Sequence, residues 1–172
     1  MLNSPNTYLL IALLVCATLA FLRRREPIGG WLFYFFFALY AGIAIVPFTI
    51  EASLRLLNSN NWPVKTQYAW YLVGTVPLEA LHLATVIAAT SMLIARTERR
   101  LKILRMVIFL TLIAAVICGT LMVFHPPLET LALPNFTGAL SALFWSLYFM
   151  ASVRVKRVFV TRDWSEYPPV KS

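Results

Sequence analysis

The amino-acid sequence predicts an all-α protein, a polytopic transmembrane helical bundle of five helices. The first observation is composition: 60% of the 172 residues are apolar and 13% are charged, whereas a soluble domain is nearer half apolar and a quarter charged. The second is distribution, because the apolar residues form five long runs joined by shorter polar or basic segments. Runs of about 17–25 residues can cross a bilayer as helices, so lipid is the expected solvent of these runs.

The first run covers residues 8–22 and is followed by Arg23, Arg24 and Arg25. A cleaved signal peptide is the alternative interpretation, but such peptides carry their basic residues before the apolar run. We therefore expect a retained helix whose N-terminus lies outside the cytoplasm. Cleavage would leave four helices and the same position for the C-terminus.

The second run, residues 31–50, begins with Trp31, a residue type common at the headgroup level of membranes. Gly29 and Gly30 precede it. Because glycines interrupt regular elements, we expect them to form an elbow where the chain turns from the interface into the bilayer. A polar connection over residues 51–66 follows the run.

The third run, residues 68–94, contains Pro77, Glu79 and His82. Proline lacks a backbone N–H and crowds the preceding turn, so we expect a helix kink at Pro77. Membrane helices tolerate such breaks where a neighbour or water satisfies the freed carbonyl.

The fourth run, residues 106–124, follows a basic segment over 96–105 that we expect to be a connection, and it ends at His125, Pro126 and Pro127. A short loop reaches residue 135, and the fifth run covers 136–152. The charged tail from residue 153 onward predicts an extended or partly disordered end.

The basic residues indicate the orientation of the helices. In the five-helix layout, 13 of the 15 Lys and Arg residues lie on one side, and Arg55 and Lys65 alone lie opposite. The positive-inside rule makes the rich side cytoplasmic. These clusters predict contact with anionic lipid headgroups, whereas the absence of a basic face or a reading motif argues against nucleic-acid binding.

Glu79 and His82 are the candidate intramembrane polar site, because residues three apart share a helix face and ionisable groups at membrane depth often mark a site. A hydrogen bond between them, with room opened at Pro77, predicts a proton relay or a substrate site. The alternative is a structural contact of Glu79 with a hydroxyl on another helix; the candidates are Thr111, Ser141 and Tyr148.

Other chemistry has little support in the sequence. A di-metal centre needs a second Glu-x-x-His pair and further carboxylates on facing helices, and the remaining acids lie in predicted loops or the tail. We therefore expect no metal and no other cofactor. A lipid-modifying enzyme would have only His125 and Glu129 for its chemistry, and we expect no enzymatic activity.

Two segments together resemble a known family. The segment 26–32 and the segment 145–160 resemble the entry and the closing signature of the bacterial membrane proteins grouped as domain of unknown function 2569, although Val158 replaces the usual Thr. The residues that carry the resemblance are Gly29, Gly30, Trp31, Trp145, Tyr148, Arg154 and Lys156. Glu79 is similar to an acidic position of that family. The resemblance implies a four-helix domain over about residues 28–160 of a bacterial inner-membrane protein, and it implies no activity.

The predicted organisation is an N-terminal helix with its basic stop (1–26), a four-helix transmembrane domain (27–160) and a cytoplasmic tail (161–172). The leading functional hypothesis is an accessory or interaction subunit of a membrane assembly, with other membrane proteins or a second copy as partners. The alternative is a small proton-coupled transporter or ligand-binding membrane protein that uses Glu79 and His82.

Overall fold

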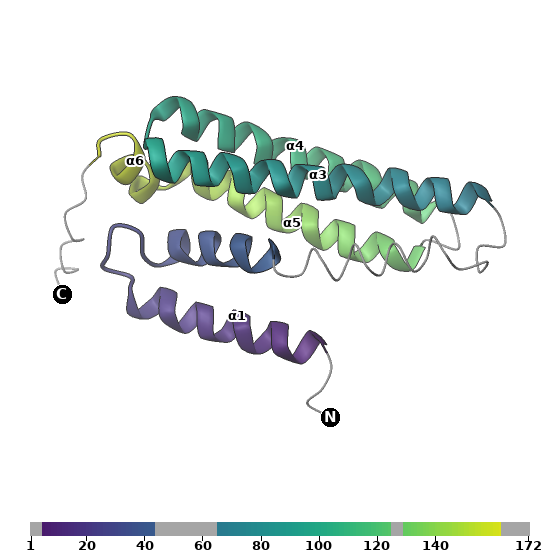
Figure 1. Ribbon diagram of the computed structural model, residues 1–172, viewed down its shortest axis with the longest axis horizontal. Coiled ribbons are helices and arrows are strands. Elements are labelled where there is room, and N and C mark those ends of the chain that lie inside the picture. Colours follow the sequence, from purple (N-terminus) through teal and green to yellow (C-terminus); the bar gives the residue numbers. More distant parts are fainter. Residues whose placement is uncertain (1–4, 44–64, 125–128, 163–172) are drawn as a thin grey trace. The chain divides into compact units, whose positions relative to one another are not determined.

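The computed structural model describes residues 5–43, 65–124 and 129–162, and it contains helices and turns but no strand within these ranges (Figure 1). This confirms the all-α prediction. The helices are α1 (Pro5–Leu22), a helix over Trp31–Ile43, α3 (Lys65–Ala95), α4 (Glu98–Val123), α5 (Glu129–Ala151) and α6 (Val153–Phe159).

Two of these helices are long and apolar enough to cross a membrane, over Leu72–Ala95 and Glu98–Val123. A third crossing is obtained if two consecutive helices, Ala132–Ala151 and Val153–Phe159, count as one span. This pair is bent by 65° at its break. The described part of the chain therefore supports two or three crossing helices. The second half of the second predicted run, residues 44–50, lies outside the described residues, as does the predicted polar connection up to residue 64.

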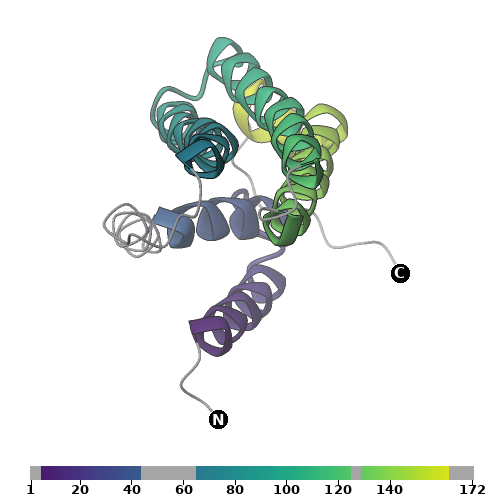
Figure 2. The same cartoon turned by 90° about the vertical axis from the view of Figure 1, so that its right-hand side faces the viewer.

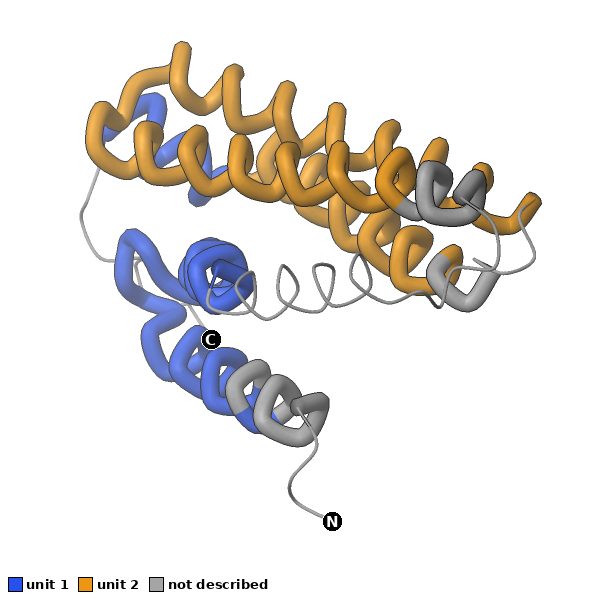
Figure 3. Tube along the Cα trace, turned by 45° about the vertical axis from the view of Figure 1, so that its right-hand side comes forward, with its two compact units in different colours: residues 1–47, 153–172 blue, residues 48–152 orange. Residues whose placement is uncertain are grey.

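The chain divides into two compact units (Figure 3). Unit 1 comprises Met1–Pro47 and Val153–Ser172, and unit 2 comprises Phe48–Ser152. This division groups segments by their contacts in space, and the predicted domain boundaries at residues 26/27 and 160/161 stay a prediction.

In unit 2, α4 packs against both α3 and α5, and Figure 2 shows the three helices nearly end on. At two glycines, a side chain of the neighbouring helix occupies the space that a larger residue would fill. A Cβ at Gly74 would lie 2.1 Å from Cε of Met122, and a Cβ at Gly119 would lie 3.1 Å from Cε1 of Phe136. The side chain of Met122 is almost fully buried, so it fills the space that Gly74 leaves open.

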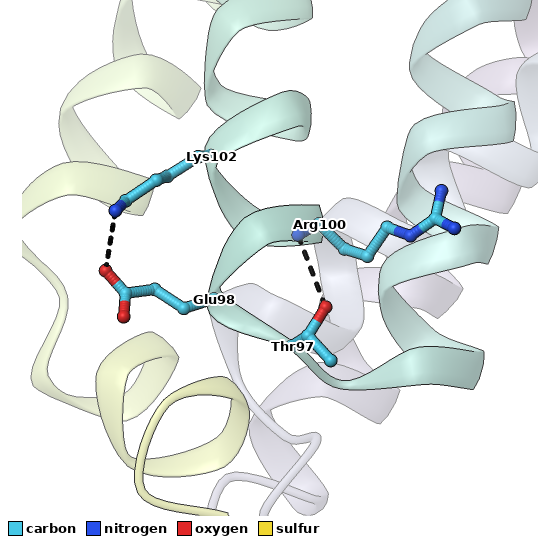
Figure 4. Close-up of polar contacts among 4 residues, drawn as sticks. All are labelled: Thr97, Glu98, Arg100 and Lys102. Carbon is cyan, nitrogen blue, oxygen red and sulfur yellow. Dashed lines mark hydrogen bonds and ion pairs between the residues drawn. The ribbon is translucent and has the colours of Figure 1, made fainter.

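The basic segment 96–105 was expected to be a connection, but only Arg96 and Thr97 lie outside the helices. Thr97 has an extended backbone and accepts the Arg100 N–H at 3.4 Å, which is an N-cap contact (Figure 4). Glu98 in the first turn complements the helix dipole and pairs with Lys102 at 3.1 Å. The polar residues therefore begin α4, and the predicted connection was wrong over 98–105.

Two further boundaries differ from the prediction. The helix α5 begins at Glu129, so the predicted loop up to residue 135 is helical from that point and includes Pro134. Pro134 is the sixth residue of α5 and lies beyond the first four N–H groups, so the helix lacks one backbone hydrogen bond at this position. Residues 153–159 form α6 instead of an extended tail, since Val155, Val158 and Phe159 share a buried face. Residues 163–172 lie outside the described chain.

Candidate functional site

The candidate site lies on α3 beside Pro77, where the helix continues without interruption. Pro77 cannot donate to the carbonyl four residues earlier, which is that of Val73. The thiol of Cys118 on α4 donates to this oxygen, with Sγ 3.8 Å away. A neighbouring helix thus satisfies the carbonyl, as expected for a proline inside a membrane helix. The predicted kink itself stays a prediction.

Glu79 lies on the exposed side of α3. The large side chains that share this side are apolar: Val76, Leu83 and Ile87 are 55%, 59% and 61% exposed. No hydrogen bond or ion pair of Glu79 occurs among the residues that the structure describes. Glu79 is therefore an ionisable residue on an otherwise apolar exposed side, and it has no partner from the described part of its own chain.

His82 is half-buried, and its Nε2 atom is buried without a hydrogen-bond partner in the described chain. The hydrogen bond expected between Glu79 and His82 is not made by this nitrogen. The spacing of three residues would allow the contact, so the missing bond reflects the orientation of the two side chains. His82 is half-buried on the helix that carries the buried residues Thr85 and Ala89, whereas Glu79 is exposed.

The three hydroxyl groups considered as partners for Glu79 lie elsewhere. Thr111 donates its hydroxyl to the carbonyl of Val107 in its own helix at 2.9 Å. Ser141 is exposed on α5. The ring of Tyr148 lies edge-on to Trp145, with centroids 5.7 Å apart, and similarly contacts Phe149.

The first segment of the family resemblance and the end of the second, residues 153–160, contact each other within unit 1. Arg154, on α6, donates from Nη1 to the carbonyl of Gly29 at 2.5 Å and from Nη2 to the carbonyl of Arg24. The Gly30 N–H donates to the carbonyl of Ala20 at 3.0 Å and thereby closes the end of α1. The expected elbow is thus a turn over residues 23–30. It is held by the side chain of Arg154, which lies 125 positions from Gly29 in sequence.

Both glycines of this turn are required by its geometry. A Cβ at Gly29 would lie 1.7 Å from the carbonyl oxygen of Arg23, which is far inside contact distance. Gly30 has φ +57°, the left-handed region that side chains disfavour. Trp31 follows and is 58% exposed, and Lys156 on α6 is also exposed. The expected position of Trp31 at headgroup level stays a prediction.

Arg105 makes a long-range contact that the sequence prediction missed, because it assigned this residue to a loop. It lies within α4, and its Nε and Nη2 atoms donate to the carbonyl of Phe149 at 3.0 and 2.6 Å. That carbonyl lies in the last turn of α5, where helix carbonyls lose their backbone donors. The sequence does contain a signal for this position. Arg105 lies four residues after Leu101 and three before Ile108, so it shares a helix face with these two buried residues.

The alternative catalytic pair is not placed by the structure, because His125 and the side chain of Glu129 lie outside the described residues. No group of three or more His, Cys, Asp or Glu residues within the described ranges could hold a metal ion. Ser146, on α5, is a further buried polar residue whose Oγ atom has no partner in the described chain.

No protein-family model, curated protein or solved structure matches this chain. The resemblance in segments 26–32 and 145–160 stays a prediction.

Proposed function

We propose that this chain is an integral membrane protein of a bacterial inner membrane, with five spans, an external N-terminus and a cytoplasmic C-terminus. The two or three helices that are long and apolar enough to cross a membrane support the proposal. So does the collection of 13 of the 15 basic residues on one side of the five-span layout. Its resemblance to inner-membrane proteins with no assigned activity points the same way.

Within the membrane, the chain acts as an accessory or interaction subunit that binds a partner through the Glu79 side of α3. The observation that carries this proposal is the exposed carboxyl group of Glu79 between Val76, Leu83 and Ile87. An ionisable group in hydrocarbon is costly and normally faces protein or water. A partner helix that offers a hydrogen-bond donor would remove this cost, and both another membrane protein and a second copy meet that requirement.

Capture after mild detergent extraction tests this proposal. The tagged chain should recover a partner, or a second copy with a different tag, in several detergents. Glu79→Leu should abolish recovery at an unchanged protein level, because it removes the polar contact and keeps the helix apolar. Ser141→Leu is the matched control, since it replaces an exposed polar residue on α5. Recovery of a lone monomer throughout, or full recovery with Glu79→Leu, would refute the proposal.

A second candidate function is a small proton-coupled carrier that uses Glu79 and His82. The buried, unpartnered Nε2 of His82 favours it, because a buried polar atom without a partner often marks a site that a water or ligand completes. Glu79→Gln should then abolish a proton-linked flux while the protein level stays constant. Wild-type growth and flux in that variant would eliminate this function. We assign no catalytic activity, because the sequence contains no catalytic motif.

A further inference from the structure

We propose that the arginine-rich turn of unit 1, residues 23–30 together with Arg154, is a binding site for the phosphate headgroup of an anionic lipid. The inference rests on the membrane topology of the proposed function, which puts this turn at the cytoplasmic surface. It does not depend on the partner of Glu79.

The three consecutive arginines of the turn have different roles. Arg23 pairs with Glu26 at 2.8 Å and lies over the ring of Phe33, with Cζ 5.4 Å from the ring centroid. Arg24 lies over the ring of Phe21 at 4.2 Å. Arg25 is exposed and makes no hydrogen bond, ion pair or ring contact within the described chain. One guanidinium group is therefore available to a ligand beside two that are already ordered.

Arg154 changes the electrostatics of the same turn. The C-terminal end of a helix is its negative end, where carbonyl groups lack donors. The guanidinium group of Arg154 covers the carbonyls of Arg24 and Gly29 just beyond α1. It thereby adds a fourth positive charge to a segment whose acidic side chain, Glu26, is paired with Arg23. The turn therefore has an excess of positive charge, which attracts anions.

The aromatic residues around the turn identify the source of the anion. Phe21 is 63% exposed and Trp31 is 58% exposed, so apolar and amphipathic rings border the cationic turn. This combination is suited to the membrane–water interface, where rings lie at headgroup level and arginines reach the phosphates. Guanidinium groups bind phosphate in a bidentate manner, and a lipid would place its acyl chains beside the rings. We therefore commit to a lipid headgroup and not to a free phosphate ion.

The test measures lipid binding to the full-length protein in detergent by native mass spectrometry and by thermal unfolding. The probes are dioleoylphosphatidylglycerol, dioleoylphosphatidylcholine and inorganic phosphate. Wild type should retain phosphatidylglycerol in preference to phosphatidylcholine and be stabilised by it. Arg25→Gln should weaken phosphatidylglycerol binding about tenfold or more, the value expected for loss of a direct hydrogen bond between a guanidinium group and the phosphate, without lowering the unfolding temperature of the lipid-free protein.

Arg99→Gln is the matched control, because Arg99 is also exposed on the predicted cytoplasmic side but belongs to unit 2. It should bind the lipid as wild type does, and Arg25→Lys should retain most of the affinity. An unchanged preference in Arg25→Gln would overturn the proposal, as would an equal loss in Arg99→Gln or equal stabilisation by inorganic phosphate. Glu79→Leu should leave lipid binding intact, so failure of the proposed partner interaction and failure of this site are distinguishable.

Discussion

Two of the described turns between successive helices are closed in opposite ways. The turn between α3 and α4 has two residues, Arg96 with φ 47° and Thr97, whose hydroxyl caps the helix that follows. The turn between α1 and the helix Trp31–Ile43 covers residues 23–30 and is fastened by Arg154 from the other end of the chain. The first turn is therefore specified by its immediate neighbours in sequence, whereas the second combines local contacts with a long-range one.

This difference predicts how much stability a substitution in each turn should remove. A local turn loses a small amount of stability when its cap is removed, because the packed faces of α3 and α4 still hold the helices together. In the turn over residues 23–30, the backbone at Gly29 leaves no room for a side chain. The charged donor of this turn, Arg154, has no nearby replacement. We therefore expect substitutions in unit 1 to have larger effects than substitutions at the start of α4.

The largest effect is expected for Gly29→Ala. The new Cβ would lie 1.7 Å from a backbone oxygen, that of Arg23, and a backbone atom cannot move away by changing rotamer. We expect a loss of about 3 kcal/mol or more, at or beyond the upper range of overpacking, seen as a lower thermal unfolding midpoint or a loss of folded protein.

Gly138→Ala is the control for that substitution. Gly138 is exposed in α5, and a Cβ there meets nothing within 4 Å. Alanine should stabilise the helix by about 0.5–1 kcal/mol. Equal stability of the two variants would show that the turn does not have the close backbone approach described for Gly29.

An intermediate effect is expected for Arg154→Ala. It removes the charged donors of the Gly29 and Arg24 carbonyls, and a hydrogen bond to a charged group contributes about 1.5–3 kcal/mol. We expect a loss of about 2–3 kcal/mol in thermal unfolding and faster proteolysis within residues 23–30. Arg154→Lys should recover part of the loss, because an ammonium group is a point charge that lacks the fork geometry. If Arg154→Ala unfolds at the wild-type temperature, the long-range closure is refuted.

The smallest effect is expected for Thr97→Ala. Loss of an N-cap typically costs about 0.5–2 kcal/mol, and the 3.4 Å contact with the Arg100 N–H is long, so we expect the lower end of that range. Thr97→Ser keeps the hydroxyl group and should unfold close to the wild-type temperature. A loss in Thr97→Ala as large as that in Arg154→Ala would contradict the contrast between the two turns.

Much of the helical layout could be predicted from the sequence. The runs of apolar residues predicted the helicity and order of the described segments, and Gly29 and Gly30 marked the turn before Trp31. The helix starts at Glu98 and Glu129 were missed, because hydropathy treats charged residues as loop although Glu, Arg and Lys are good helix formers. Arg99 and Arg100 therefore looked like a connection and instead form the first turn of α4.

The candidate site was only partly predictable. Placement of Glu79 and His82 on α3 followed from the third apolar run, but their separation into exposed and half-buried sides did not. A membrane helix is apolar on all sides, so the usual contrast between polar and apolar faces gives little orientation. The roles of Arg105 and Arg154 as donors to distant carbonyls depend on which helix ends meet in space, and spacing along the chain does not contain that information.

The distance along the chain between Gly29 and Arg154 has a consequence for biosynthesis. Ribosomes add about 5–20 residues per second, so Arg154 is made roughly 6–25 s after Gly29 across the 125 positions between them. Throughout that interval the nascent first hairpin has two carbonyls without their final donor. The contacts of Arg154 with these carbonyls consequently form late in translation, after the hairpin itself has been made.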